Sequence, residues 1–595
     1  MRKFFTLLAL MACTLTFAAT TVQIGDLYYS LGTTTAQVVQ DPTTNKSVYS
    51  AYTSVTVPAS VTYEDYTYPV TSIGTSAFEA LTNLQSVTLP ATITTIYTDA
   101  FYGCTKLGSV NLPEGLTTIN QRAFYNCNLT SITVPSTVTS IGSGAFKGNP
   151  TTSVVWKPVT CSIGSDSNAP FYNEYSKITS FTFADGVQEI PSYLCKHMSK
   201  LDTVVLPPSV RLLGQNAFQN CTSLKSINLP VTQKTLPVSF LEGCIALESI
   251  ELPATLTTIS TDAFYGCTSL KNVNLHEGLT TIGQRAFYNC KLADITVPST
   301  VTSIGGGAFK GNPTTSVTWL PKTCSTSSDD SAPFYSTSSK ITSFTFGDSV
   351  QVIPAYLCKN MSKLDTIIIP PTVTSIGQSA FMYCTSLKSF EFPQGIKTVA
   401  TSVLEGCTAL QSVTIPSTVT TINQDAFYNC SGLQAIYNYA FTPQTITARA
   451  VYNVNKNTCI LYVPIDYIDL YQAKDVWKDF LNIVGVATDL QFEDQIVNVT
   501  YLKQDSTLHY MEAQTWAIPY APRIEGFTFL KWQVLAGDLA EGIVLQAVYT
   551  ANEPTDNNTP SLQGRSGEAS KLVKEGNVYI LRDDALFTIT GQKVK

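Results

Sequence analysis

Residues 262–290 read DAFYGCTSLKNVNLHEGLTTIGQRAFYNC, a stretch that contains Ala-Phe-Tyr-x-Cys twice and places Cys267 and Cys290 23 residues apart. The surrounding frame is L-P-x-x-[VL]-T-x-I-G-x-x-A-F-x-x-C-x-x-L-x-x-[VI]-x, and it recurs in the segments 229–252, 252–275 and 415–436. A fixed period in the twenties is typical of a solenoid in which each repeat forms one coil. The Ala-Phe positions from Phe78 to Phe427 predict roughly 16 coils.

Each position of the frame has a physical reason. Leu270, Val273 and Leu275 alternate with polar residues, which indicates a short strand with one face turned inward. Ala263 and Phe264 are expected to fill the inside of the corner. A single coil leaves apolar surface above and below, so only stacking buries it. The frame therefore predicts a mainly β, right-handed solenoid of short parallel strands.

The cysteine follows the phenylalanine by three residues and occupies the same slot in nine coils. A small buried side chain with a weak S–H donor suits such a corner. Stacked coils would place the sulfurs about 4.7–4.9 Å apart with parallel side chains, whereas a disulfide needs side chains directed at each other. We therefore expect a structural column of free thiols, with disulfides between coils or a metal column as alternatives. The nine members are Cys104, Cys127, Cys221, Cys244, Cys267, Cys290, Cys384, Cys407 and Cys430.

Four further cysteines lie outside this slot. Cys195 and Cys358 stand where phenylalanine is expected, and Cys161 and Cys324 precede them by 34 residues. Disulfides Cys161–Cys195 and Cys324–Cys358 are therefore candidates. Cys459 has no evident partner.

The chain also repeats on a larger scale. Cys104 and Cys267 are 163 residues apart, and residues 121–150 are nearly identical to residues 284–313. A block of about seven coils is thus duplicated, and the identity between the halves can reflect recent copying. Each half contains an irregular coil, with Trp156 in the first and Trp319 in the second, which we expect to bulge from one face.

The amino-terminal residues have the pattern of an export signal. Met1-Arg2-Lys3 is basic, Phe4 to Phe17 is mostly apolar, and Ala18 and Ala19 offer a cleavage site, which predicts a signal peptide over 1–19. No later segment is long and apolar enough for a membrane-spanning helix. Leu10-Met11-Ala12-Cys13 loosely resembles a bacterial lipobox, so lipidation of Cys13 stays an open alternative.

Composition and motifs favour a protein without catalysis. Only 13% of the 595 residues are charged, the net charge is −7, and no Lys/Arg run suggests a nucleic-acid partner. The three histidines are His197, His276 and His509. No HExxH, GxSxG, phosphate-binding loop or paired metal-ligand spacing is present. We therefore predict no enzyme activity, no cofactor and no metal site.

The remaining candidate for a functional site is the solvent-facing surface of the coils. One residue per strand should point outward, which gives a mostly uncharged face of hydroxyl and amide groups that includes Asn111, Thr133, Asn274 and Thr296. Such a face could bind a protein strand or a glycan by many modest hydrogen bonds, or it could be soluble β-favouring filler. A second column follows the phenylalanines, and it either contacts a partner or packs coil to coil. Its members are Tyr102, Tyr125, Tyr265, Tyr288 and Tyr428. Exposure of Trp156 and Trp319 would favour glycan binding.

The repeated frame resembles the BspA-like leucine-rich-repeat proteins, which are common on the surface of Bacteroidetes. The resemblance covers about residues 50–485, and it includes the ending Thr458-Cys459-Ile460-Leu461-Tyr462-Val463-Pro464 followed by Tyr471, Trp477, Phe480 and Ile483. It implies an N-terminal cap over 20–60, leucine-rich repeats over 61–440 and a C-terminal cap over 441–487.

Residues 492–551 resemble a small β-grasp repeat of Listeria and Bacteroides surface proteins, which implies a stalk or spacer. The matching residues are Pro522, Gly526, Phe527, Phe529, Trp532, Ala547 and Tyr549. Residues 552–570 are polar and predict a linker. Residues 571–595 predict a terminal β-hairpin, and a tail that directs secretion is the alternative.

The resemblance implies an exported, non-catalytic cell-surface protein, secreted or attached to the outer membrane. The expected role is that of a monomeric adhesin that binds host matrix or other extracellular proteins through its repeat face. One alternative is an envelope component that binds glycans for nutrient capture. The other is a structural spacer without a dedicated ligand. The step from fold to adhesion is analogy.

Overall fold

The structure is a computed structural model of the chain, and it divides into two compact units, Met1–Gly485 and Val486–Lys595. It describes residues 20–40, 42, 48–164, 166–172, 175–326, 332–335 and 337–486, together with the strands β39 to β45 of the second unit. The predicted signal peptide over 1–19, including Cys13, lies outside the described residues.

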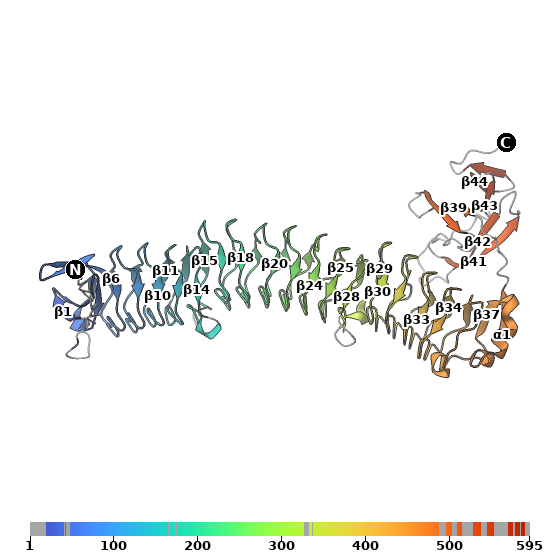
Figure 1. Cartoon of the computed structure of the whole chain (residues 1–595), viewed down its shortest axis with the longest axis horizontal. Helices are drawn as coiled ribbons and strands as arrows, with labels where there is room; N and C mark the ends of the chain where they lie inside the picture. The colour runs from blue at the N-terminus through green and yellow to red at the C-terminus, as the bar shows by residue number, and fades with distance from the viewer. Residues whose placement is uncertain are drawn as a thin grey trace, which may run out of the picture. The chain divides into compact units, whose positions relative to one another are not determined.

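The first unit is a solenoid whose coils stack side by side along one axis (Figure 1). It has about 18 turns with a period of roughly 23 residues, and helix makes up only 6% of the structure. The predicted mainly β solenoid of parallel strands is therefore confirmed. The sequence estimate of roughly 16 coils counts Ala-Phe positions from Phe78 to Phe427, and the structure adds turns beyond that range, such as the one with Ala450-Val451 in place of Ala-Phe.

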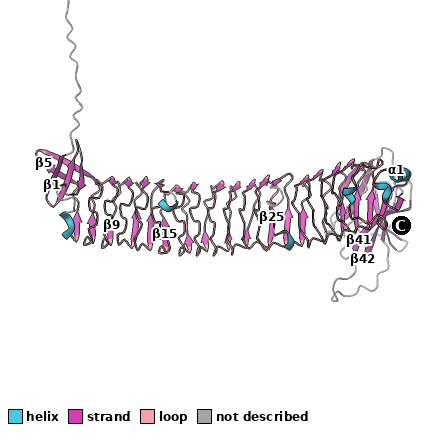
Figure 2. Cartoon of the chain, turned by 90° about the horizontal axis from the view of Figure 1, so that it is seen from below, coloured by secondary structure: helices cyan, strands magenta, loops and turns pink. Residues whose placement is uncertain are grey.

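Most coils contribute one short strand to each of two faces, which Figure 2 shows along opposite edges of the solenoid. We call the strands after the Cys-x-x-Leu segment face 1 and those at the Thr-x-Ile segment face 2. Face 1 consists of β4 (Ser54–Thr56), β7 (Ser86–Thr88), β9 (Ser109–Asn111), β11 (Ser131–Val134), β13 (Ser153–Trp156), β15 (Ser180–Phe183), β17 (Thr203–Val204), β19 (Ser226–Ile227), β21 (Ser249–Ile250), β23 (Asn272–Val273), β25 (Asp294–Val297), β27 (Ser316–Trp319), β29 (Ser343–Phe346), β32 (Ser389–Glu391), β34 (Ser412–Ile415), β36 (Ala435–Asn438) and β37 (Ile460–Pro464).

The strands of face 2 are shorter, because only two residues of most coils join the ladder there. They are β6 (Tyr66–Ile73), β8 (Thr95–Ile96), β10 (Thr118–Ile119), β12 (Ser140–Ile141), β14 (Ser162–Ile163), β16 (Glu189–Ile190), β18 (Leu212–Leu213), β20 (Thr235–Leu236), β22 (Thr258–Ile259), β24 (Thr281–Ile282), β26 (Ser303–Ile304), β28 (Ser325–Thr326), β30 (Val352–Ile353), β31 (Ser375–Ile376), β33 (Thr398–Val399) and β35 (Thr421–Ile422).

Parallel pairing keeps equivalent residues of successive coils in line. In β10 and β12, for example, Thr118 pairs with Ser140 and Ile119 with Ile141. The isoleucines of face 2 point inward, and all but the half-buried Ile163 are buried. Beside them, Thr117 donates its hydroxyl hydrogen to the carbonyl of Thr94 at 3.0 Å, and the hydroxyls of several other coils do the same. Many hydroxyls of face 2 are therefore used to hold coil to coil.

Both ends of the solenoid are covered. At the start, β1 (Thr20–Ile24), β2 (Leu27–Leu31) and β3 (Ala36–Val39) form antiparallel pairs, and β3 joins β6. At the end, the helix α1 (Ile468–Ala473) and the short turn η7 (Trp477–Asp479) follow β37, before β38 (Asn482–Val486). Tyr471 Oη donates to the Ala440 carbonyl at 2.8 Å and Trp477 Nε1 to the Gln444 carbonyl at 2.9 Å. These buried aromatic side chains shield the last coil from water.

The second unit contains only antiparallel pairs among its described strands. β39 (Ile496–Leu502) pairs with β40 (Leu508–Gln514). A separate sheet has the order β41 (Phe527–Ala536), β42 (Val544–Ala551), β43 (Ala569–Lys574), β44 (Asn577–Arg582) and β45 (Ala585–Thr588). The β-grasp resemblance of 492–551 is not confirmed, because β41 and β42 share their sheet with β43 to β45. In the described part of the chain, no helix has the length and apolar character needed to cross a membrane.

Candidate binding surfaces

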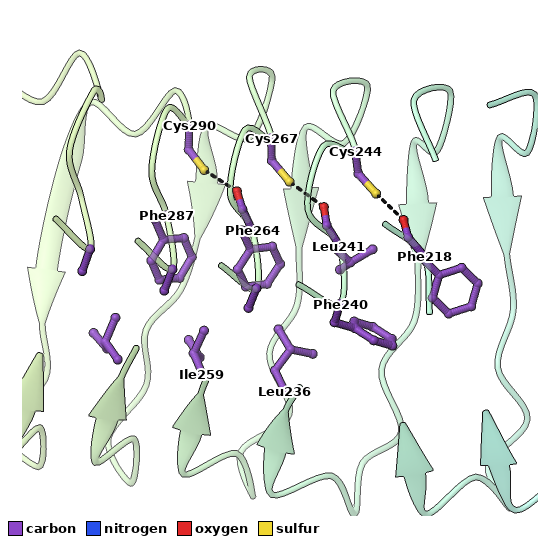
Figure 3. Close-up of a cluster of buried hydrophobic side chains, with 14 of the residues drawn as sticks. Phe218, Leu236, Phe240, Leu241, Cys244, Ile259, Phe264, Cys267, Phe287 and Cys290 are labelled. Carbon is purple, nitrogen blue, oxygen red and sulfur yellow. Dashed lines mark hydrogen bonds between the residues drawn. The ribbon is translucent and has the colours of Figure 1, made fainter. Parts of the chain in front are cut away.

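The recurrent cysteines hold one coil to the coil before it. Figure 3 shows Cys244, Cys267 and Cys290, whose Sγ atoms donate to the carbonyls of Phe218 at 3.2 Å, Leu241 at 3.1 Å and Phe264 at 3.2 Å. The other cysteines of the slot make the same bond to the residue 26 positions earlier. All nine are buried free thiols.

Burial also sets the chemistry of these thiols. It raises the pKa of Cys221 and of Cys267 to about 12, so that both remain protonated donors at neutral pH. A thiol must ionise to act as a nucleophile or a metal ligand, so this column has a structural role. Asn149 fills the slot in another coil, where its Nδ2 donates to the carbonyls of Phe124 and Phe146, both at 2.8 Å.

Neither candidate disulfide is present. Cys161, Cys195, Cys324 and Cys358 are all buried free thiols. Cys161 directly precedes β14 of face 2, where its Sγ contacts the carbonyl of the adjacent Ser162 at 3.6 Å. Cys195 instead fills the phenylalanine position of a corner. The two members of each pair thus belong to different parts of their coils, and the equal spacing in both halves comes from the duplication.

The tryptophans of the irregular coils are not surface residues. Trp156 ends β13 and Trp319 ends β27, and both side chains are 0% exposed. Trp156 pairs with Val134 and Trp319 with Val297, so both tryptophans stand at an inward position of the alternating strand. Trp156 lies against Phe181, with ring centroids 6.3 Å apart. The expectation that these residues form a binding surface is therefore wrong.

The outward residues of face 1 do lie at the surface. Asn111, Thr133, Asn274 and Thr296 are all exposed. The same outward column contains two apolar side chains, Val205 at 68% exposure and Ile368 at 58%. They are 163 residues apart and therefore occupy equivalent coils of the two halves.

Two hollows of very different size lie on the surface of the solenoid. Beside Val273, Phe287 and Ile295 the hollow has a volume of about 20 Å³, far below the size of a ligand pocket. A wider and open hollow of about 470 Å³ lies on face 2 beside Thr374 and Gly395.

The tyrosine column lies on the corner between the two faces and is half-buried. The rings of Tyr102 and Tyr125 stack at 5.1 Å with an interplanar angle of 9°, and those of Tyr265 and Tyr288 stack at 4.8 Å with the same angle. In the last coils Tyr428 stacks on Tyr452 at 5.0 Å. These tyrosines pack coil to coil and keep part of their surface exposed to solvent.

Lysine and arginine side chains lie over the rings of this tyrosine column, and the sequence did not predict these contacts. Lys147 Nζ lies between two rings, 5.8 Å from the centroid of Tyr125 and 5.0 Å from that of Tyr172. The Arg122 guanidinium lies 5.5 Å from the Tyr102 centroid. A single repeat does not reveal this contact between lysine and tyrosine. Lys147 occupies the position that Tyr125 fills in the preceding coil, so the contact is found only when successive coils are compared.

The second half repeats this arrangement. Lys310 Nζ lies 5.8 Å from the Tyr288 centroid and 4.9 Å from that of Tyr335, and Arg285 lies 5.4 Å from Tyr265. Arg285 also forms an ion pair with Asp262 at 2.7 Å, which raises the pKa of the guanidinium.

The described residues contain no obvious reaction centre. No group of three or more His, Cys, Asp or Glu side chains that could hold a metal ion occurs among them. His197 lies beside Tyr175, with ring centroids 6.0 Å apart, and burial lowers its pKa. His509 is in β40, and its side chain lies outside the described residues.

Comparison with known proteins finds leucine-rich-repeat proteins of bacteria. A leucine-rich-repeat protein from Bacteroides ovatus is 25% identical and has a TM-score of 0.42, with 70% of this chain and 94% of that chain covered. A leucine-rich cell-surface protein from Faecalibacterium prausnitzii is 24% identical, with a TM-score of 0.28 and coverage of 70% and 94%. The leucine-rich-repeat protein of T. pallidum is 24% identical, with a TM-score of 0.23 and coverage of 42% and 91%. No curated protein matches.

The family model of the BspA-type leucine-rich-repeat region matches in six copies, over residues 71–194, 167–251, 188–318, 234–362 and 330–458. These matches span more than half of the chain, and they fall on the coils that form the solenoid. The protein belongs to the family of BspA-type leucine-rich-repeat proteins.

Proposed function

We propose that the protein is an exported, non-catalytic adhesin that acts as a monomer at the cell surface and binds an extracellular protein through face 1. Its family consists of bacterial cell-surface proteins and is typically non-enzymatic, which supports this function. The observation that carries the proposal is the outward column of face 1. It is a long row of small polar side chains with an exposed apolar residue, Val205 or Ile368, at the same place in each half.

This composition suits contact with a folded protein. Small uncharged residues can form many modest hydrogen bonds at low cost in side-chain entropy. Apolar side chains that are surrounded by polar ones provide the anchor points that dominate binding energy at interfaces. Because many outward side chains of face 1 are exposed and the solenoid is built from paired strands, a partner would meet a preformed surface.

The test is a binding screen of the purified full chain against matrix proteins and mucins, followed by two variants. Val205→Asp combined with Ile368→Asp should weaken binding of the partner at least about 10-fold, because charged groups replace the apolar anchors. Val231→Asp is the matched control, since Val231 is 73% exposed but lies in the turn after β19. Equal binding by all variants, or no binding to any protein of the screen, would contradict the proposal.

A further inference from the structure

The corner between the faces contains a second candidate surface, which we call the Tyr–Lys ladder. In each half it consists of a stacked tyrosine pair with an arginine over the first ring, a lysine between the second ring and a third tyrosine, and an aspartate bound to the arginine. The members are Asp99, Tyr102, Arg122, Tyr125, Lys147 and Tyr172 in the first ladder, and Asp262, Tyr265, Arg285, Tyr288, Lys310 and Tyr335 in the second.

The duplication allows the two halves to be compared with each other. All six ladder positions hold the same residue in both copies. Several outward positions of face 1 have diverged over the same interval, including Ser131 to Asp294, Asn228 to Glu391 and Val155 to Thr318. Copying alone would have preserved both sets, so the ladders have changed less than the face next to them.

The ladders present hydrogen-bond donors. Lys147 and Lys310 have no acidic partner among the described residues, and the hydroxyl groups of the ladder tyrosines likewise lack one there. Asp99 is already engaged by Arg122 at 2.6 Å. Neighbouring rings cover much of each other's faces, so a ligand would meet ring edges, phenol groups and ammonium groups. This set of groups suits carboxylate or sulfate oxygens.

We propose that the two ladders are two copies of one binding site for the anionic groups of a linear acidic polysaccharide, and that one ligand chain occupies both. Seven coils at 4.7–4.9 Å each place the ladders on the order of 33 Å apart along the solenoid. Two identical sites at a fixed distance can be used together only by a ligand that repeats its charged groups, as a polysaccharide does. Binding at one ladder then raises the effective concentration at the other. The ladders lie on the corner and not on face 1, so this inference is independent of the proposed function.

The experiment uses the full chain with heparin and with polygalacturonate, which distinguish sulfate from carboxylate groups, and with uncharged dextran as the negative probe. Calorimetry with a short oligosaccharide should give two sites in the unchanged protein, one in Lys147→Ala or Lys310→Ala, and none in the double variant. Long chains should bind about 10²-fold more tightly than short ones, and either single variant should remove that gain. Lys225→Ala, which replaces an exposed lysine outside the ladders, should change neither value.

A deletion tests the same inference without altering any ladder residue. Removal of 122–284 joins Gln121 to Arg285 and leaves one complete ladder, composed of Asp99, Tyr102, Arg285, Tyr288, Lys310 and Tyr335. This variant should bind short oligosaccharides at one site and lose the gain for long chains. The inference is overturned if the double lysine variant binds heparin and polygalacturonate like the unchanged protein, or if the deletion keeps the gain. Tighter binding of polyglutamate than of either polysaccharide would assign the ladders to an acidic protein instead.

Discussion

At the scale of single residues, one slot shows how the repeat selects its side chains. The slot needs a donor that reaches the carbonyl of the preceding coil from a fully buried position. Cysteine does so through its thiol, as in Cys267, and asparagine does so through its amide, as in Asn149. A disulfide needs side chains directed at each other, whereas the cysteine side chains of successive coils run parallel and each thiol bonds to a carbonyl, so the thiols stay free.

Replacement of Cys267 by alanine tests this role. The buried Leu241 carbonyl would lose one of its two donors, since the Cys244 N–H also donates to it at 3.2 Å, and a small cavity would remain. We expect the free energy of unfolding to fall by about 1–3 kcal/mol. The measurement is urea unfolding of the full chain followed by circular dichroism. Thr268→Ala, at the exposed neighbouring position, should have almost no effect, and equal values for the two variants would disprove the structural role.

The raised pKa values predict how stability depends on pH. The thiols of Cys221 and Cys267 titrate near 12 in the folded chain and near 9 in the unfolded chain, so folding favours the neutral form. Their contribution is complete below pH 9 and is lost as the pH rises toward 12, at about 1.4 kcal/mol per pH unit for each thiol. The free energy of unfolding, measured from pH 8 to 11, should therefore fall with a smaller slope in Cys267→Ala than in the unchanged protein. Identical slopes would contradict the assigned burial.

At the scale of elements, the corners are joined by a column of stacked rings. Phe287 lies between Phe264 at 5.1 Å and Phe309 at 5.6 Å, and all three side chains are buried. Replacement of Phe287 by alanine removes contacts to both neighbouring coils. We expect a loss of about 3–5 kcal/mol in the free energy of unfolding.

Tyr288→Ala is the matched control for Phe287→Ala, because Tyr288 is the next residue and is only half-buried. Its loss should be clearly smaller in the same urea experiment. If the tyrosine substitution cost as much as the phenylalanine substitution, the corner would depend on its outer ring and not on the buried column.

The sequence predicts strands and corners correctly where the same requirement on a side chain recurs at the same position of each repeat. The inward isoleucines, the Ala-Phe corner and the cysteine slot belong to the frame, and each copy supports the others. Trp156 was misplaced because its irregular coil was expected to bulge outward, although Trp156 pairs with the inward Val134 of the preceding coil and takes the same direction. The position of Lys147 between two rings depends on three coils at once, and a pattern within one repeat does not contain that information.

At the scale of the whole solenoid, stability comes from contacts between adjacent coils. Backbone pairing, thiol donors and ring stacking each connect one coil to the next. The free energy of unfolding of such a protein is approximately a sum of contributions from single coils and from pairs of adjacent coils. A set of coils can therefore be removed if the coils that become adjacent match each other. The duplication provides such a match, because residues 121–127 and 284–290 have the same sequence.

Deletion of 122–284 should therefore yield a folded chain. Arg285 would meet Asp99 in place of Asp262, and Phe287 would stack on Phe101, so the new junction reproduces contacts that already exist. Small-angle scattering should show a solenoid shortened on the order of 33 Å, and the thermal midpoint should change little because both caps remain. Deletion of 122–273 is the out-of-register control, since it would join Gln121 to Asn274 and place the turn that follows β23 where a corner is required. If both deletions folded equally well, the coils would not depend on matched neighbours; if neither folded, stability would extend beyond adjacent coils.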